Sequence, residues 1–225
     1  MTTPASLQPV ARQTYVRAGV RIEIITVVWM AIEAAIAITA GIIAGSVLLT
    51  AFGIDSIIEL VSGSVLLWRL SIEARGGSLE RVQRAENRAA WIAGFGLIAL
   101  CLYIVVTSAL SLWVHNHPEG SAVGIALATA ALVLMPILVW QKRKIAARID
   151  SSALRADAAC SLTCTYLAAT LLLGLGLVAF FGWWWADAVA ALALLYWIIP
   201  EAREAIEGAR SGRGACGCDD SPGSD

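Results

Sequence analysis

Two carboxylates lie one helical turn apart inside an apolar stretch of the chain. Asp55 and Glu59 occur in the segment AFGIDSIIEL, and they are the only charged residues between Val47 and Trp68. Residues four apart on a helix share one face, with their Cβ atoms about 5–6 Å from one another. Two acidic side chains placed in this way, with no basic neighbour, are typical of a site that receives a cation.

Two cysteines repeat the same spacing farther along the chain. Cys160 and Cys164 occur in SSALRADAACSLTC. If the cysteine pair faces the acidic pair, four donors converge, and four donors that include sulfur suit tetrahedral Zn²⁺. Thiolates argue against Mg²⁺ and Ca²⁺, which prefer oxygen ligands. Cysteine is also a common small residue in membrane helices, so packing is an open alternative for Cys160.

The acids that we single out within or near the other apolar segments are Glu33, Asp157 and Asp187. A charged side chain at the centre of a membrane helix costs about 2.5–3.5 kcal/mol on insertion scales. We expect no Lys or Arg at mid-depth to pair with these acids. A protonated acid that hydrogen-bonds a neighbouring helix is an open alternative for Glu33 and Asp187. We place Glu33 and Asp157 among the candidate metal residues, beside the two pairs.

The elements that position these residues must be membrane-spanning helices. The chain has 225 residues, of which 59% are hydrophobic and 15% charged, which is more apolar and less charged than a soluble domain. A helix needs about 20 apolar residues to cross the hydrocarbon core, and single strands would leave backbone groups unpaired there. Six segments reach or approach that length: about 22–44, 47–69, 89–114, 121–140, 156–181 and 184–199. The sequence therefore predicts an all-α membrane protein built as a bundle of six transmembrane helices.

The basic residues predict how this bundle is oriented. All sixteen Lys and Arg residues fall within residues 12–21, 69–88, 142–155 and 203–213. With an even number of spans, these four places lie on one side of the membrane. The positive-inside rule then predicts that both termini are cytoplasmic.

The domain organisation follows from the same pattern. We expect a cytoplasmic N-terminal segment (1–20), one transmembrane domain (21–200) and a short polar cytoplasmic tail (201–225) that is disordered after its first turns. The net charge of −1 provides no overall field for nucleic acid, so we exclude nucleic acid as a partner. We expect a multi-pass protein embedded in the lipid bilayer of the bacterial plasma (inner) membrane.

At the paired residues the chain resembles the cation diffusion facilitator (cation efflux) family. GSVLLTAFGIDSIIELVSGSVLLWRL is similar to the family's second span, with Asp55 and Glu59 at the positions of its paired acidic motif. SSALRADAACSLTCTYLAA is similar to the fifth span, with Cys160 and Cys164 in place of that span's His/Asp pair. GWWWADAVAALALL is similar to the sixth span, including its acid at Asp187.

The resemblance implies a secondary transporter that exports a divalent transition-metal cation, with Zn²⁺ the expected ion, in exchange for protons. It implies a transporter and not an enzyme, an antiporter that works as a homodimer, with the metal ion as cargo and no resident cofactor. Only about 25 residues follow the sixth span, so we expect the copies to pair through the membrane segments. The sequence contains no phosphate-binding loop, so ATP is not the expected energy source. Protons and metal would compete for the same carboxylates and thiolates, which couples the two flows.

Two other functions remain open at this point. An intramembrane thiol oxidoreductase would use Cys160 and Cys164, but cysteines one turn apart on a straight helix are badly placed for a disulfide, and the acids go unexplained. A metal-binding membrane protein that does not transport is the second alternative. His115 and His117 in HNHPEG and the tail segment CGCDD (216–220) could also bind metal, or could be a solvated loop and an unselected terminus.

Overall fold

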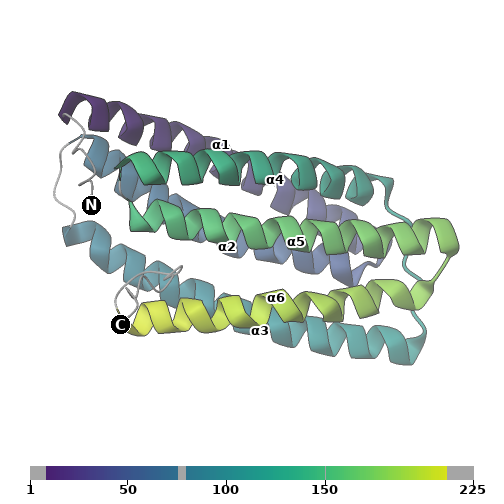
Figure 1. The fold of residues 1–225 in the computed structure, drawn as a ribbon. Helices are drawn as coiled ribbons and strands as arrows, with labels where there is room; N and C mark the ends of the chain where they lie inside the picture. Colours follow the sequence, from purple (N-terminus) through teal and green to yellow (C-terminus); the bar gives the residue numbers. More distant parts are fainter. Residues whose placement is uncertain (1–8, 76–79, 150, 212–225) are drawn as a thin grey trace, which may run out of the picture.

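The computed structural model describes residues 9–75, 80–149 and 151–211. The described residues form six helices, drawn in Figure 1: α1 (Pro9–Ala44), α2 (Val47–Ala74), α3 (Glu80–Val114), α4 (Ala122–Ile149), α5 (Ser152–Phe181) and α6 (Trp184–Ser211). Each helix contains a stretch long and apolar enough to cross a membrane. The prediction of an all-α bundle of six transmembrane helices is therefore confirmed.

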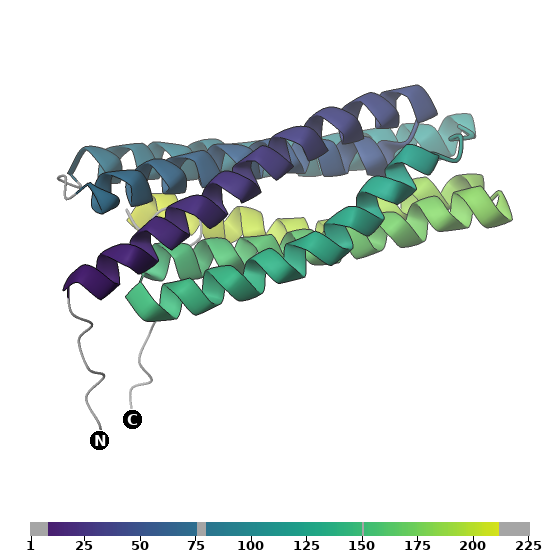
Figure 2. The same cartoon turned by 90° about the horizontal axis from the view of Figure 1, so that it is seen from above.

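The six helices pack side by side as a closed ring, and one of them also makes contacts across the middle of the ring. Going round the ring, the neighbours are α1, α2, α3, α6, α5 and α4, and α4 returns to α1. Helix α2 also contacts α5 and α6 across the middle of the ring. Figure 2 shows α1 running obliquely over the bundle, from the side of α4 toward α2. Helix α2, which carries the acidic pair, is therefore the central helix of the bundle.

The two ends of the bundle differ in their connections. Helix α1 begins and α6 ends at the same end, which we call the terminal end (Figure 1). The α1–α2, α3–α4 and α5–α6 connections lie at the other end, which we call the hairpin end. There Gly45 adopts a left-handed φ of 62°, which costs glycine little. Asn116 Nδ2 donates to the Gly45 carbonyl at 3.1 Å, which ties the α3–α4 connection to the α1–α2 turn.

Helices α1 and α2 approach each other closely because two glycines lie between them. A Cβ added at Gly53 would lie 2.8 Å from the backbone nitrogen of Ile38, and one added at Gly41 would lie 2.7 Å from that of Thr50. Small residues allow membrane helices to approach in this way. The approach fixes the position of α2 just before Asp55.

Several helices extend beyond the apolar stretches seen in the sequence. Helix α1 begins at Pro9, where we expected a separate N-terminal segment up to residue 20, and α4 continues to Ile149. These extensions bury apolar side chains in a cluster of their own. The buried members of the cluster are Val16, Leu66, Leu70, Ala146, Ile149 and Leu154. The packing of this cluster keeps the helices ordered past the apolar core.

Helix α6 continues through Pro200 to Ser211, where we expected a polar tail from residue 201. Proline removes one backbone donor, which membrane helices tolerate when neighbouring groups compensate. Three alanines on one face of this extension are buried: Ala202, Ala205 and Ala209. The face packs closely on α3, because a Cβ added at Gly94 would lie 2.8 Å from Ile206 Cγ1. The extension makes Glu201 part of the bundle.

Candidate metal centre

Asp55 and Glu59 lie at mid-depth on the central helix. Counted at about 1.5 Å per residue, they are roughly 12 Å and 18 Å from the start of α2 at the hairpin end. Asp55 is only 1% exposed, and Glu59 is partly buried. The i, i+4 spacing places both carboxylates toward the interior of the ring, where α2 meets α5 and α6.

One cysteine of α5 completes a group of three possible ligands. A carboxylate oxygen of Asp55, one of Glu59 and the Cys164 sulfur all lie within 4.8 Å of one another. The Cys164 thiol is 1% exposed and donates a hydrogen bond to Glu59 Oε2. Two oxygens and a sulfur from two helices therefore converge on one buried point.

Several oxygens of this group have no hydrogen-bond partner. Both carboxylate oxygens of Asp55 and Oε1 of Glu59 are buried and unpaired. Within residues 9–75, 80–149 and 151–211, no Lys or Arg forms an ion pair with either carboxylate. Buried polar groups are almost always paired, so unpaired carboxylate oxygens in a membrane bundle indicate a position for a cation.

Glu33 lies beside the group of three and outside it. Its Oε1 accepts a hydrogen bond of 2.9 Å from the hydroxyl of Ser56, and Glu33 is completely buried. Ser56 directly follows Asp55, and the Glu33 carboxylate interacts electrostatically with that of Asp55. Glu33 is therefore placed to adjust the charge at the site rather than to contact the same ion as Cys164.

Asp157 is paired with a lysine, which the sequence did not lead us to expect. Lys142 is fully buried inside α4, where we expected it to be part of a cytoplasmic loop. Its Nζ bonds Asp157 and lies 3.1 Å from Oε2 of the buried Glu23 and 3.4 Å from Ser161 Oγ. The expectation that no basic group pairs with the acids is thus wrong for Asp157, because an elongated α4 brings Lys142 back into the bundle.

Cys160 does not join the group of three. It lies one turn before Cys164 on α5, and it is disulfide-bonded in this structure. A sulfur in a disulfide carries no thiolate charge, so it is a poor metal ligand. Cys164 is a free thiol, so the two cysteines are not joined to each other. The structure therefore does not show the Cys160–Cys164 disulfide of an intramembrane oxidoreductase.

Asp187 has a structural role at the hairpin end. Its carboxylate accepts hydrogen bonds from the Ser46 hydroxyl and from the backbone N–H groups of Val47, at 2.8 Å, and Leu48, at 3.3 Å. These donors belong to the first turn of α2, whose N–H groups have no helical partner. Asp187 of α6 therefore caps the helix that carries the acidic pair.

The histidines of HNHPEG lie apart from the site. The rings of His115 and His117 pack on Trp184, with centroids 4.9 Å and 5.7 Å away, at the hairpin end. The candidate metal-binding segment 216–220 lies outside the described residues. The two loop histidines therefore pack against Trp184 and do not contact the group of three.

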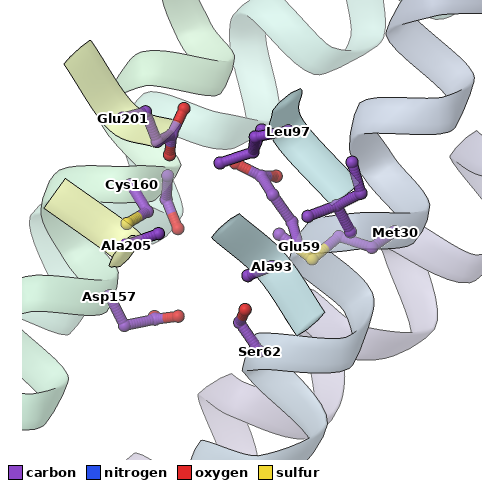
Figure 3. A pocket seen from close by; sticks show the side chains of 11 residues that line it. Met30, Glu59, Ser62, Ala93, Leu97, Asp157, Cys160, Glu201 and Ala205 are labelled. Atoms are coloured by element: carbon purple, nitrogen blue, oxygen red, sulfur yellow. The ribbon is translucent and has the colours of Figure 1, made fainter. Parts of the chain in front are cut away.

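A pocket opens between α2, α3, α5 and α6 beside the group of three (Figure 3). Three carboxylates line it, from Glu59, Asp157 and Glu201, and the other lining side chains are apolar ones, hydroxyls and Cys160. The cavity volume is about 30 Å³, enough for about two waters. Glu201 was missed from the sequence, although its place directly after the apolar stretch of the sixth span was a signal.

The known proteins that this chain resembles are transporters. A family model described as the cation efflux transmembrane domain matches residues 24–210. An uncharacterized transporter of Synechocystis sp. is 29% identical over 155 residues, 68% of this chain and 50% of the relative. The cation-efflux pump FieF of Citrobacter koseri is 29% identical over 193 residues, 84% of this chain and 64% of the pump.

A second pump of that name shows the same extent of similarity. The cation-efflux pump FieF of Salmonella arizonae is 28% identical over 161 residues, 70% of this chain and 53% of the pump. The chain therefore spans about half to two thirds of the length of these relatives. The part of the chain that the family model matches, residues 24–210, includes all three residues of the group of three.

Proposed function

Because the chain belongs to the cation efflux (cation diffusion facilitator) family, we propose that it exports a divalent transition-metal cation, Zn²⁺ by preference, from the cytoplasm. The observation that carries this proposal is the convergence of Asp55, Glu59 and Cys164 on one buried point between α2 and α5. A cation that enters the membrane loses water, and the fixed oxygens and sulfur replace that water. The metal ion is the substrate, bound and released in each cycle.

The donor set favours Zn²⁺ over harder ions. Thiolate sulfur binds zinc and similar soft or borderline metals well, whereas Mg²⁺ and Ca²⁺ prefer oxygen alone. Three protein ligands would leave a fourth tetrahedral position for water, as in zinc sites that exchange a ligand. Such an incomplete set suits an ion that has to leave again.

Exchange for protons gives the cycle its driving force. Carboxylates and thiols must lose protons before they bind metal, so metal binding releases protons and protonation releases metal. The contact between the Cys164 thiol and Glu59 Oε2 brings two such groups together. Alternating exposure of the site to the two sides would convert this competition into exchange. Glu33, beside Asp55, would modulate the competition.

The site lies where two helices from opposite parts of the chain meet, which suits such a cycle. Helix α2 supplies Asp55 and Glu59, and α5 supplies Cys164. A small shift between the two helices would separate the ligands and release the ion.

The homodimer expected from the resemblance is part of the proposal. The α3 span, only 22% of which is buried, offers an apolar face for a second copy, and the mass of the detergent-solubilised protein would show whether two copies associate.

Metal-dependent flux into sealed proteoliposomes tests the proposal, together with metal binding to the same preparations by calorimetry. Asp55→Asn keeps the shape of the side chain and removes its charge. We expect it to abolish Zn²⁺ flux and to weaken binding by more than about 100-fold, since changes outside the first ligands alone cost about 10–100-fold. Glu33→Gln is the matched control, because it neutralises a buried carboxylate outside the group of three, and its effect should be smaller.

Two results would contradict the proposal. Flux of Asp55→Asn at the wild-type level would remove Asp55 from the site. Stoichiometric metal binding by the wild type without any flux would instead indicate the non-transporting metal-binding protein. Cys164→Ser adds a check on ion selectivity, because a hydroxyl is a poorer zinc ligand, and preference should move toward harder ions such as Mn²⁺.

A further inference from the structure

Glu201 is a half-buried acid, and one of its carboxylate oxygens is buried without a hydrogen-bond partner. It lies one residue after Pro200, in the part of α6 that packs on α3. Its Oε2 is buried and accepts no hydrogen bond, and in the described part of the chain no ion pair involves it. A buried, unpaired carboxylate oxygen needs a physical reason, which packing does not supply.

The pocket of Figure 3 connects Glu201 to the group of three. Side chains of Glu201 from α6, Glu59 from α2 and Asp157 from α5 line the same space, and Glu59 also belongs to the group of three. Counted at about 1.5 Å per residue from the hairpin end, Glu201 is roughly 26 Å along α6 and Glu59 roughly 18 Å along α2. The pocket therefore lies next to the metal centre on the side of the terminal end.

The charges around the pocket are compensated unequally. Asp157 is paired with Lys142, whereas Glu59 and Glu201 have no basic partner among the described residues. The Glu201 carboxylate interacts unfavourably with those of Glu59 and Asp55. Like charges buried together in a membrane bundle are stabilised by a cation between them.

We propose that Glu201, together with Glu59, forms a second cation-binding position, the loading position, beside the metal centre. It holds a divalent cation that still carries water before the ion passes to Asp55, Glu59 and Cys164. This inference rests on the proposed function of the chain. Glu59 is shared, so it can pass the ion from one position to the other.

The donors of the two positions differ in chemistry. The loading position offers the carboxylate oxygens of Glu201 and Glu59 and the hydroxyl of Ser62, and oxygen donors accept hard and borderline cations alike. The metal centre adds the sulfur of Cys164. The loading position therefore concentrates divalent cations with little discrimination, and selection among them takes place at Cys164.

Removal of the Glu201 carboxylate should weaken the initial binding of the ion and leave binding at the metal centre unchanged. For Glu201→Gln we expect the KM of Cd²⁺ transport to rise roughly tenfold with kcat nearly unchanged, the pattern of a lost binding contact outside the rate-limiting step. Glu207→Gln is the matched control, because Glu207 is an exposed acid on the same helix that does not line the pocket. Its KM should stay at the wild-type value.

Binding to the purified full-length chain separates the two positions. The other four cysteines, Cys101, Cys160, Cys216 and Cys218, are replaced by serine, so that Cys164 is the sole thiol. Cd²⁺ bound at the centre then gives an ultraviolet cadmium–thiolate band. When that band is saturated, added Mn²⁺ reports the loading position through loss of its free-ion paramagnetic resonance signal. We expect one Mn²⁺ equivalent in this background and in Glu207→Gln, and none in Glu201→Gln, which should keep the cadmium–thiolate band.

Each outcome decides between the two proposals. If the background protein shows neither the cadmium–thiolate band nor Cd²⁺ flux, the proposed function fails. If both are present and Glu201→Gln keeps its KM and its Mn²⁺ equivalent, only the loading position is overturned. Loss of the band in Glu201→Gln would also overturn it, because Glu201 would then support the centre or the fold. Glu201→Asp keeps the charge and should restore most of the affinity, and failure to do so counts against a cation-binding role.

Discussion

At the scale of single residues, the partner of each buried acid determines its role. Asp157 is paired with Lys142, Asp187 with backbone N–H groups of α2, and Glu33 with the hydroxyl of Ser56. Asp55 has no hydrogen-bond partner at all. The partners of Asp157 and Asp187 hold helices in place, whereas Asp55 is free to bind a cation.

Lys142 should be a major contributor to stability. Lys142→Met would leave the carboxylates of Glu23 and Asp157 buried without a counter-ion, and breaking a buried pair in this way costs about 3–5 kcal/mol. Lys144→Met is the control, because Lys144 is exposed and lies over the ring of Trp140, a contact that contributes about 0.5–1 kcal/mol. Reversible unfolding in mixed micelles measures both. Equal unfolding free energies for the two variants would contradict the assignment of Lys142 as the counter-ion.

At the scale of elements, the position of α2 depends on close contacts along its length. Its start is capped by Asp187 of α6, and its next turns pack against α1 at Gly53. Because Asp55 follows Gly53 by two residues, the contact with α1 sets the depth and rotation of the acidic pair. The metal centre is therefore supported by helices that contribute none of its three ligands.

Two glycines allow this support to be tested with the same substitution. Gly53→Ala places a Cβ under 3 Å from Ile38, which forces α1 and α2 apart, and overpacking of this kind costs about 1–3 kcal/mol. Gly176→Ala in α5 meets no atom within 4 Å, and alanine favours the helix over glycine by about 1 kcal/mol. We expect Gly53→Ala to lower both the unfolding free energy and the Zn²⁺ affinity, and Gly176→Ala to lower neither. Unchanged Zn²⁺ affinity in Gly53→Ala would show that α1 does not position the acidic pair.

At the scale of the whole molecule, six spans place the start of α1 and the end of α6 at one end of the bundle (Figure 1). The chain is a multi-pass protein of the bacterial inner membrane. The distribution of Lys and Arg predicts that the terminal end is cytoplasmic. The direction of the proposed export depends on this orientation, because the loading position lies toward the terminal end.

Cysteine labelling in intact cells tests the orientation of the bundle in the membrane. In a background without native cysteines, Glu119→Cys at the hairpin end should react with a membrane-impermeant maleimide in intact cells. Glu119 is exposed, so its replacement disturbs little. Arg75→Cys, exposed at the terminal end, is the matched control and should react only after permeabilisation. The reverse pattern would invert the orientation and the proposed direction of transport.

The sequence by itself determined the spans and the helix face that carries the acidic pair. Apolar stretches of about 20 residues define membrane helices without reference to other parts of the chain. The i, i+4 spacing places Asp55 and Glu59 on one helix face in any packing. Cys164 was a candidate because the RAD motif aligns it with one of the paired motif positions in the fifth span of the family that the chain resembles. These features are local, which is why they could be predicted.

The tertiary structure alone decided which polar groups meet. The Lys142–Asp157 contact joins residues that the sequence placed in a loop and at a helix end, and it exists only because α4 extends past its apolar stretch. Glu201 lines the pocket only because α6 continues through Pro200 and packs on α3. Asp187 reaches the start of α2 from 140 residues away along the chain. Such pairings depend on the rotation and depth of one helix against another, and these are set by side-chain packing across the whole bundle and not by local pattern.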